Sequence, residues 1–211
     1  MSEDLNSFSK MKEHYKSLYK QHGNSVKSVQ WRDQSSQYAR FKILADIEYN
    51  IGSVIDIGCG LGDLYGYLLD TRNYQGSYLG LDFVNEFIEA AKKKYSNNTK
   101  SSFRDFDLKN DTIPKGYEYI LLSGVFNNKM DGNKEFMLDG IRKMFDSCSK
   151  GIAFNALSTY VDYKDEHLYY SNPCEVFDFC KNELSRKITL RHDYLVKENS
   201  IPFEYTIYLY R

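Results

Sequence analysis

The sequence predicts an α/β fold of the doubly wound kind, in which helices cover both faces of a largely parallel sheet. The first observation is that short β-rich runs alternate with amphipathic segments of about 10 to 15 residues, the pattern of βαβ units. The second is the length of 211 residues, because one domain usually takes about 100 to 200. The third is the chain end, where the β-rich runs 188–194 and 203–211 are joined by a loop too short for a crossover helix and should pair antiparallel.

The expected elements follow one another without an internal repeat. A first helix begins with Ser35 or Ser36 as its cap and runs to about Tyr49. Buried strands are expected at 54–58, 77–82, 117–124 and 151–158, a short edge strand at 102–107, and helices at 61–71, after 82 as far as Tyr95, and at 133–148. A last helix starts after Asn172, because Pro173 at its first position and Glu175 complete a capping-box pattern.

The first 35 residues are polar and weakly basic, and we find no clean helical or strand period in them. We therefore expect an N-terminal arm or lid over 1–35 and a folded domain over 36–211.

Composition and charge exclude several classes of protein. Lys and Arg total 28 and Asp and Glu total 29, so the net charge of −1 creates no field that would attract nucleic acid or an anionic membrane. We find no apolar run of about 18 residues and no signal-peptide core, which favours a cytoplasmic protein. The four cysteines show no CxxC spacing, so we expect reduced thiols and no metal site.

The most informative segment is VIDIGCGLGD, in which Gly58, Gly60 and Gly62 follow a hydrophobic strand and open a helix. A dinucleotide-binding fingerprint would place a third glycine at position 63, where Asp63 stands instead. A carboxylate at a helix N-terminus repels a pyrophosphate, and Asp56 adds further negative charge. The loop therefore suits a ligand with cationic groups and no phosphate, such as S-adenosylmethionine.

VIDIGCGLGD, followed by YLGLDFVNEFIEAAKKKY at 78–95, closely resembles the class I S-adenosylmethionine-dependent methyltransferases. The resemblance covers about 36–211 and implies a seven-stranded sheet in the order 3-2-1-4-5-7-6 with strand 7 antiparallel. It implies S-adenosylmethionine as the cofactor. The alternative from the residues alone is a doubly wound domain that binds another nucleotide.

The same resemblance implies roles for the ends of the first two strands. Asp56 and the turn Gly58, Cys59 and Gly60 would hold the methionine moiety and approach the ribose. Asp82, at the end of the second strand, would accept hydrogen bonds from both ribose hydroxyls.

Further residues would surround the adenine and the methyl donor. Phe83 would lie against the adenine, Asp107 would accept from its amino group, and the amide of Leu108 would pair with the ring. Asp105 is the competing register for Asp107. Three residues would close the fourth strand beside the methyl donor: Ser123, Gly124 and Phe126. Core packing is the alternative for both phenylalanines.

The acceptor side is less defined by motifs. The segment LLSGVFN lacks the [DN]PP[YF] motif of enzymes that methylate nucleobase amino groups, and Asn127 at its end is a candidate catalytic residue. The segment 154–170 follows the fifth strand and adds Asn155 and Tyr160. His192 is a candidate general base, or else a structural residue paired with its charged neighbours.

Segments similar to SGVFN and RHDY, with a Trp and an Arg ahead of the first helix, occur in a subgroup of small stand-alone methyltransferases; here these are Trp31 and Arg40. The resemblance implies that the arm folds over the cofactor and that Trp31 and Arg40 help to bind it; the alternative is a disordered tail whose Trp31 docks on the surface. We therefore expect methyl transfer to a small molecule at oxygen, with no membrane partner and nucleic acid an unlikely one. An enzyme acting on RNA or protein and a non-catalytic cofactor-binding protein are the alternatives. The motifs encode neither the acceptor nor the oligomeric state.

Overall fold

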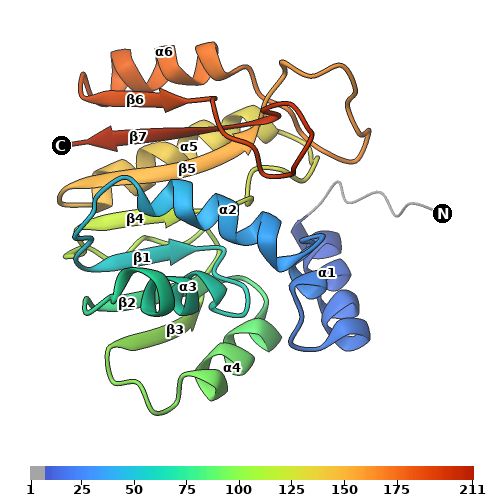
Figure 1. Cartoon of the computed structure of the whole chain (residues 1–211), viewed down its shortest axis with the longest axis vertical. Helices are drawn as coiled ribbons and strands as arrows, with labels where there is room; N and C mark the ends of the chain where they lie inside the picture. Colours follow the sequence, from blue (N-terminus) through green and yellow to red (C-terminus); the bar gives the residue numbers. More distant parts are fainter. Residues whose placement is uncertain (1–7) are drawn as a thin grey trace.

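A computed structural model describes residues 8–211, and in this part of the chain seven strands form one sheet (Figure 1). The strands are β1 (Val54–Ile57), β2 (Tyr78–Asp82), β3 (Ser101–Asp105), β4 (Tyr119–Leu122), β5 (Gly151–Leu157), β6 (Ile188–Arg191) and β7 (Glu204–Tyr210). Their order is β3-β2-β1-β4-β5-β7-β6, with β1 to β5 parallel and β7 antiparallel to both of its neighbours. The predicted order and the antiparallel terminal pair are confirmed.

Helices cover both faces of this sheet. They are α1 (Phe8–His22), the 3-10 helix η1 (Val26–Val29), α2 (Gln34–Ala45), α3 (Asp63–Arg72), α4 (Asn85–Lys94), α5 (Asn133–Ser147) and α6 (Pro173–Glu183). Helices α2, α3 and α4 pack on one face, and α5 and α6 on the other (Figure 1). Strand β1 packs on both faces. Val54 belongs to the hydrophobic cluster under α2, α3 and α4, while Ile55 and Ile57 belong to the cluster under α5 and α6.

The start of α2 differs slightly from our expectation. Asp33 is the N-cap, and its carboxylate accepts a hydrogen bond of 2.7 Å from the amide of Ser36. Serine and aspartate are both good N-caps, so residue type alone does not show which of them begins the helix. The helix also ends at Ala45, four residues before Tyr49.

The arm is more regular than expected, because α1 and η1 occupy much of it. In Figure 1, α1 stands beside the carboxyl ends of the parallel strands. Phe8, Met11 and Tyr15 do have helical spacing, but only Met11 is fully buried in α1, and charged residues separate them. The boundary at residue 35 stays a prediction.

Among residues 8–211, no helix is both long enough and apolar enough to cross a membrane.

Candidate active site

A large cavity lies at the carboxyl ends of the parallel strands, where ligands bind in open α/β sheets. Its volume is about 990 Å³. That is near the top of the range of about 300 to 1,000 Å³ for a pocket that holds one drug-sized ligand, which leaves room for a cofactor and a second small molecule.

The glycine loop after β1 forms one wall of the cavity. The amides of Gly58 and Cys59 donate to the carbonyl of Leu81, over 2.7 and 3.1 Å, which ties the loop to β2. Gly58 has φ +73°, and a Cβ there would lie 2.2 Å from Cγ2 of Val125. Glycine is therefore required both for the backbone conformation and for the approach of the β4 loop.

Asp56 and Cys59 do not line the large cavity, although Gly58 and Gly60 do. They line a separate hollow of about 30 Å³ next to the loop. Asp56 is 2% exposed and accepts a hydrogen bond from the hydroxyl of Tyr78, and burial raises its pKa to about 7. Both side chains are buried and lie outside the lining of the large cavity, so their expected contact with the methionine moiety stays a prediction.

Asp82 lines the cavity at the end of β2. Its Oδ2 accepts from the amide of Gly60 and its Oδ1 from the amide of Val84, both over 2.9 Å. Each carboxylate oxygen has further acceptor capacity, which fits a ribose diol. Burial raises the pKa of Asp82 to about 6.

The next part of the wall combines an aromatic ring with a polar turn. Phe83, Asp107 and Leu108 line the cavity. Asp107 accepts from the amide of Lys109 over 2.8 Å, so its side chain is held in place. Asp105 is exposed, lies outside the lining and is 3.9 Å from the ammonium of Lys12. The geometry thus favours the Asp107 register.

The loop after β4 brings three predicted residues to the cavity: Ser123, Gly124 and Asn127. The Oγ of Ser123 is buried without a hydrogen-bond partner, as expected of a group that meets a ligand. Asn127 Oδ1 accepts from the amide of Leu157 over 3.2 Å, which links the β4 and β5 ends.

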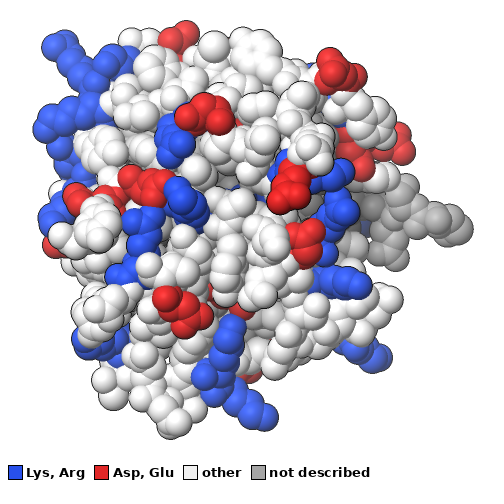
Figure 2. Space-filling model, viewed as in Figure 1, with Lys and Arg blue, Asp and Glu red and all other residues white. Residues whose placement is uncertain are grey.

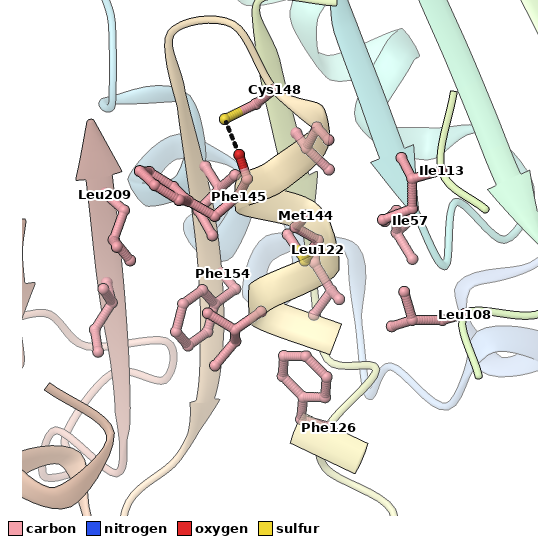
Figure 3. Packing of buried hydrophobic residues seen from close by; sticks show 14 of the residues in the cluster. Ile57, Leu108, Ile113, Leu122, Phe126, Met144, Phe145, Cys148, Phe154 and Leu209 are labelled. Atoms are coloured by element: carbon pink, nitrogen blue, oxygen red, sulfur yellow. Dashed lines mark hydrogen bonds between the residues drawn. The ribbon is translucent and has the colours of Figure 1, made fainter. Parts of the chain in front are cut away.

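Phe126 is a core residue and does not line the cavity. Its ring is 6.0 Å from that of Phe154 and 5.8 Å from that of Phe136. Figure 3 shows it next to the first turn of α5, inside the hydrophobic cluster. Of the two alternatives for Phe126, core packing is the one that the structure shows.

Trp31 and Arg40 lie together in the cavity lining, and Arg40 has a partner that we did not predict. The Nε of Arg40 donates to both carboxylate oxygens of Glu204 over 2.9 Å, and Nη1 donates to the carbonyl of Ser36 over 2.8 Å. Arg40 lies 4.2 Å from the centre of the Trp31 ring, a cation–π contact. Glu204 is 1% exposed; burial raises its pKa, and Arg40 opposes that shift. The sequence signal for this partner was Glu204 itself, a carboxylate at the start of an otherwise apolar strand.

Helix α1 adds wall residues that sequence reasoning missed. Phe8, Met11 and Tyr15 line the cavity, and the hydroxyl of Tyr15 accepts a 2.8 Å hydrogen bond from Nδ2 of Asn128. The ring of Phe83 lies 6.2 Å from Phe8 and 6.0 Å from Tyr15, both edge-on. The spacing of these residues in α1 could have revealed one apolar face.

Asn155 and Tyr160, two of the predicted catalytic residues, are not part of the cavity wall. Asn155 is fully buried behind it. Tyr160 is 56% exposed, and its hydroxyl is 3.6 Å from the Sγ of Cys174.

His192 also lies outside the wall, because it follows the edge strand β6. Its ring packs 6.0 Å from Tyr160 and 6.4 Å from Tyr205, its Nε2 has no partner, and burial lowers its pKa. Arg191 pairs with Asp193, over 3.2 Å, rather than with the histidine. His192 is therefore not part of this cavity wall, and its role as a base stays a prediction.

The residues present fit S-adenosylmethionine. Asp82 offers acceptors for the ribose, Phe83 and Leu108 offer apolar surface for the adenine, and Ser123 offers an unpaired hydroxyl. Across residues 8–211, no cluster of histidine, cysteine and carboxylate side chains could hold a metal ion.

Comparisons with known proteins agree with this geometry. A family model described as a methyltransferase domain matches residues 55–147. A protein of Mycobacterium tuberculosis (strain ATCC 25618 / H37Rv) with a provisional methyltransferase name is 32% identical over 155 residues, which are 71% of this chain and 90% of that protein. A similarly named protein of Invertebrate iridescent virus 6 is 33% identical over 98 residues, but only 46% of this chain and 35% of the viral protein are matched.

Solved structures show the same fold at low identity. The magnesium protoporphyrin IX methyltransferase of Synechocystis PCC 6803 with bound SAH has a TM-score of 0.64 and 11% identity, covering 98% of this chain and 95% of that chain. The plantazolicin methyltransferase in complex with SAH has a TM-score of 0.61 and 17% identity, covering 95% of both chains.

Proposed function

Because this chain belongs to the class I S-adenosylmethionine-dependent methyltransferases, we propose that it transfers the methyl group to a small molecule held in the large cavity, at an oxygen atom. The observation that carries the proposal is the cover over the cavity. Helix α1 and the segment of Val29 and Trp31 contribute to its lining, so an acceptor in the cavity lies between the arm and the strand ends. A folded protein or a duplex could not enter such a space without moving the arm.

The charges support a small acceptor over a polyanion. On the face shown in Figure 2, positive and negative side chains both occur across the surface. With a net charge of −1, the chain offers no strong general attraction for nucleic acid.

Inside the cavity the charged side chains are mostly satisfied by the protein. Arg40 is paired with Glu204, Asp82 accepts backbone hydrogen bonds, and Asp107 holds its own turn. Lys197 and Glu198 are exposed where they line the cavity. An unpaired charge buried against this wall would be costly, so we propose an acceptor whose enclosed part is neutral.

The apolar side chains agree with that acceptor class. Leu157, Val196 and Phe203 line the part of the cavity between the end of β5 and the loop before β7. An aromatic or aliphatic body would bury its surface there at about 25 cal/mol per Å².

The polar groups of the wall suit a hydroxyl. When bound, S-adenosylmethionine supplies a methyl group on a positively charged sulfur, which leaves as a neutral thioether when the acceptor oxygen attacks. The unpartnered hydroxyl of Ser123 and the amide of Asn127 are neutral hydrogen-bonding groups that can orient such an oxygen. Orientation alone contributes up to about 7 to 11 kcal/mol to such reactions. A hydroxyl acceptor also loses its proton; because His192 lies outside the wall, we propose that water takes up this proton.

The test uses methyl-labelled S-adenosylmethionine. The protein is incubated with matched acceptor pairs, such as a phenol and the corresponding benzoate, and separately with total RNA and with denatured protein. We expect label in the neutral small molecule as an ether. Label in RNA or protein, or a preference for the charged member of each pair, would contradict the proposal.

We also propose that the reaction takes place in the cytoplasm. The four cysteines are free thiols in the structure, three of them buried, as expected in a reducing compartment.

A further inference from the structure

Five groups from distant parts of the chain form a closed ring at the cavity, which we call the Glu204 ring. Trp31 comes from the arm, Arg40 from α2, Glu204 from β7, Asn155 from β5, and Gly124 from the loop after β4. Each contacts the next, and the last contacts the first.

The hydrogen bonds run from Arg40 through Glu204 to the backbone of Gly124. The guanidinium of Arg40 donates to the Glu204 carboxylate. Asn155 Nδ2 donates to Glu204 Oε2 over 3.3 Å, and Asn155 Oδ1 accepts from the amide of Gly124 over 2.9 Å. Asn155 can do both because it carries a donor and an acceptor, which fixes the orientation of its amide.

Aromatic packing closes the ring. Trp31 lies over the guanidinium of Arg40 at 4.2 Å. Gly124 has φ +75°, and a Cβ at this position would be 2.8 Å from Cη2 of Trp31. The Trp31 ring therefore occupies the space that a side chain at position 124 would need.

A need for stability alone does not explain the ring. Replacing a buried ion pair with apolar residues of similar volume is often neutral or stabilising, so Arg40 and Glu204 are weak evidence for a contribution to stability. The ring does join the arm to the β4 loop, and both Trp31 and Gly124 line the cavity.

We propose that Glu204 and Asn155 are positioning residues for methyl transfer. Glu204 orients Arg40 and thereby Trp31, while Asn155 links Glu204 to the Gly124 turn, so the arm is held against the β4 loop at the cavity. This inference rests on the proposed function of the cavity as the transfer site. Asn155, which the sequence suggested as a catalytic residue, does not line the cavity and acts through its neighbours.

The test variant is Asn155→Leu, which has similar size but neither hydrogen bond. The matched control is Tyr205→Phe, which removes a buried hydroxyl bonded to Ser171 over 2.6 Å and belongs to the cluster on the α5 and α6 face. Circular dichroism and cooperative urea unfolding establish that each variant is folded. Trp31 is the only tryptophan, so its emission, with and without S-adenosylhomocysteine, reports on the far side of the ring.

We expect Asn155→Leu to shift Trp31 emission to longer wavelength, although the two side chains are joined only through other members of the ring. With the acceptor found in the labelling assay, kcat should fall about a hundredfold, the size of a 1 Å misplacement, while KM for the acceptor changes little. Tyr205→Phe should match the wild type in emission and in kcat.

Glu204→Gln is the second variant, because it keeps the side-chain shape and changes a different member of the ring. It should produce the same emission shift and the same loss of kcat. Wild-type emission and turnover in either folded variant would overturn the proposal. The emission measurement needs no acceptor, so it tests whether Asn155 and Glu204 hold Trp31 in place even if the labelling assay finds no small-molecule substrate.

Discussion

The two sides of the cavity are built in different ways. On the cofactor side, the glycine loop, Asp82 and Asp107 come from consecutive βα units, and the Gly60–Asp82 hydrogen bond spans 22 residues. On the side of the Glu204 ring, which we propose as the acceptor side, the Arg40–Glu204 pair spans 164 residues and Asn155 reaches Glu204 across 49. The cofactor side is therefore encoded in short motifs, whereas the acceptor side depends on the completed sheet.

The comparison predicts that the acceptor side is the more sensitive to loss of one charge. Glu204→Leu leaves the guanidinium of Arg40 buried without its partner, which should lower the free energy of unfolding by about 3 to 5 kcal/mol. Urea unfolding at neutral pH measures this loss. The double variant Glu204→Leu with Arg40→Met removes both charges and should recover most of it. A double variant as unstable as the single one would show that the pair itself contributes the stability.

On the cofactor side, the expected loss appears in binding. Asp82→Ala removes the acceptors proposed for the ribose diol, two charge-assisted hydrogen bonds of about 1.5 kcal/mol each, so affinity for S-adenosylhomocysteine should fall roughly a hundredfold. Isothermal titration calorimetry measures the change, and the melting curve of the free protein checks the fold. Unchanged affinity would remove Asp82 from the site.

The buried carboxylate beneath the glycine loop should give the cofactor side a pH dependence. Burial raises the pKa of Asp56 to about 7, well above its usual value. The folded protein thus binds the proton more tightly than the unfolded chain, and the associated stability is complete below about pH 4 and lost as pH rises through 7. Between pH 5 and 7 the wild type should lose about 2 kcal/mol relative to Asp56→Asn, measured by urea unfolding. Parallel pH profiles would contradict the assigned shift.

The smallest expected effect decides whether Asp107 or Asp105 accepts from the adenine amino group. Asp107→Asn should weaken binding of S-adenosylhomocysteine by about fivefold, near 1 kcal/mol, because a neutral acceptor replaces a charged one. Asp105→Asn should leave affinity unchanged, since Asp105 is exposed and lies outside the cavity lining. Calorimetry on both variants makes the comparison, and the reverse pattern would move the adenine contact to Asp105.

Local patterns predicted the parts of the molecule that depend on near neighbours. Short β-rich runs between amphipathic segments predicted the strands, and the short loop between β6 and β7 predicted their antiparallel pairing. The glycines after β1 and the acidic residue ending β2 indicated the cofactor wall, because the carboxyl ends of adjacent parallel strands must meet. Phe126 shows where such patterns fail, since a phenylalanine after a strand can face either the cavity or the core.

The acceptor wall could not be located in this way. Spacing in the sequence does not show that Arg40 pairs with Glu204, because that contact exists only once α2 packs beside β7. His192 looked like a base in sequence, yet the position of β6 at the sheet edge separates it from the cavity. The sequence by itself determined the sheet, its glycine loop and the class of cofactor, through interactions between neighbouring segments. Only the tertiary structure decided which distant charges are buried together, because a buried charge requires a partner that chain folding has to bring to it.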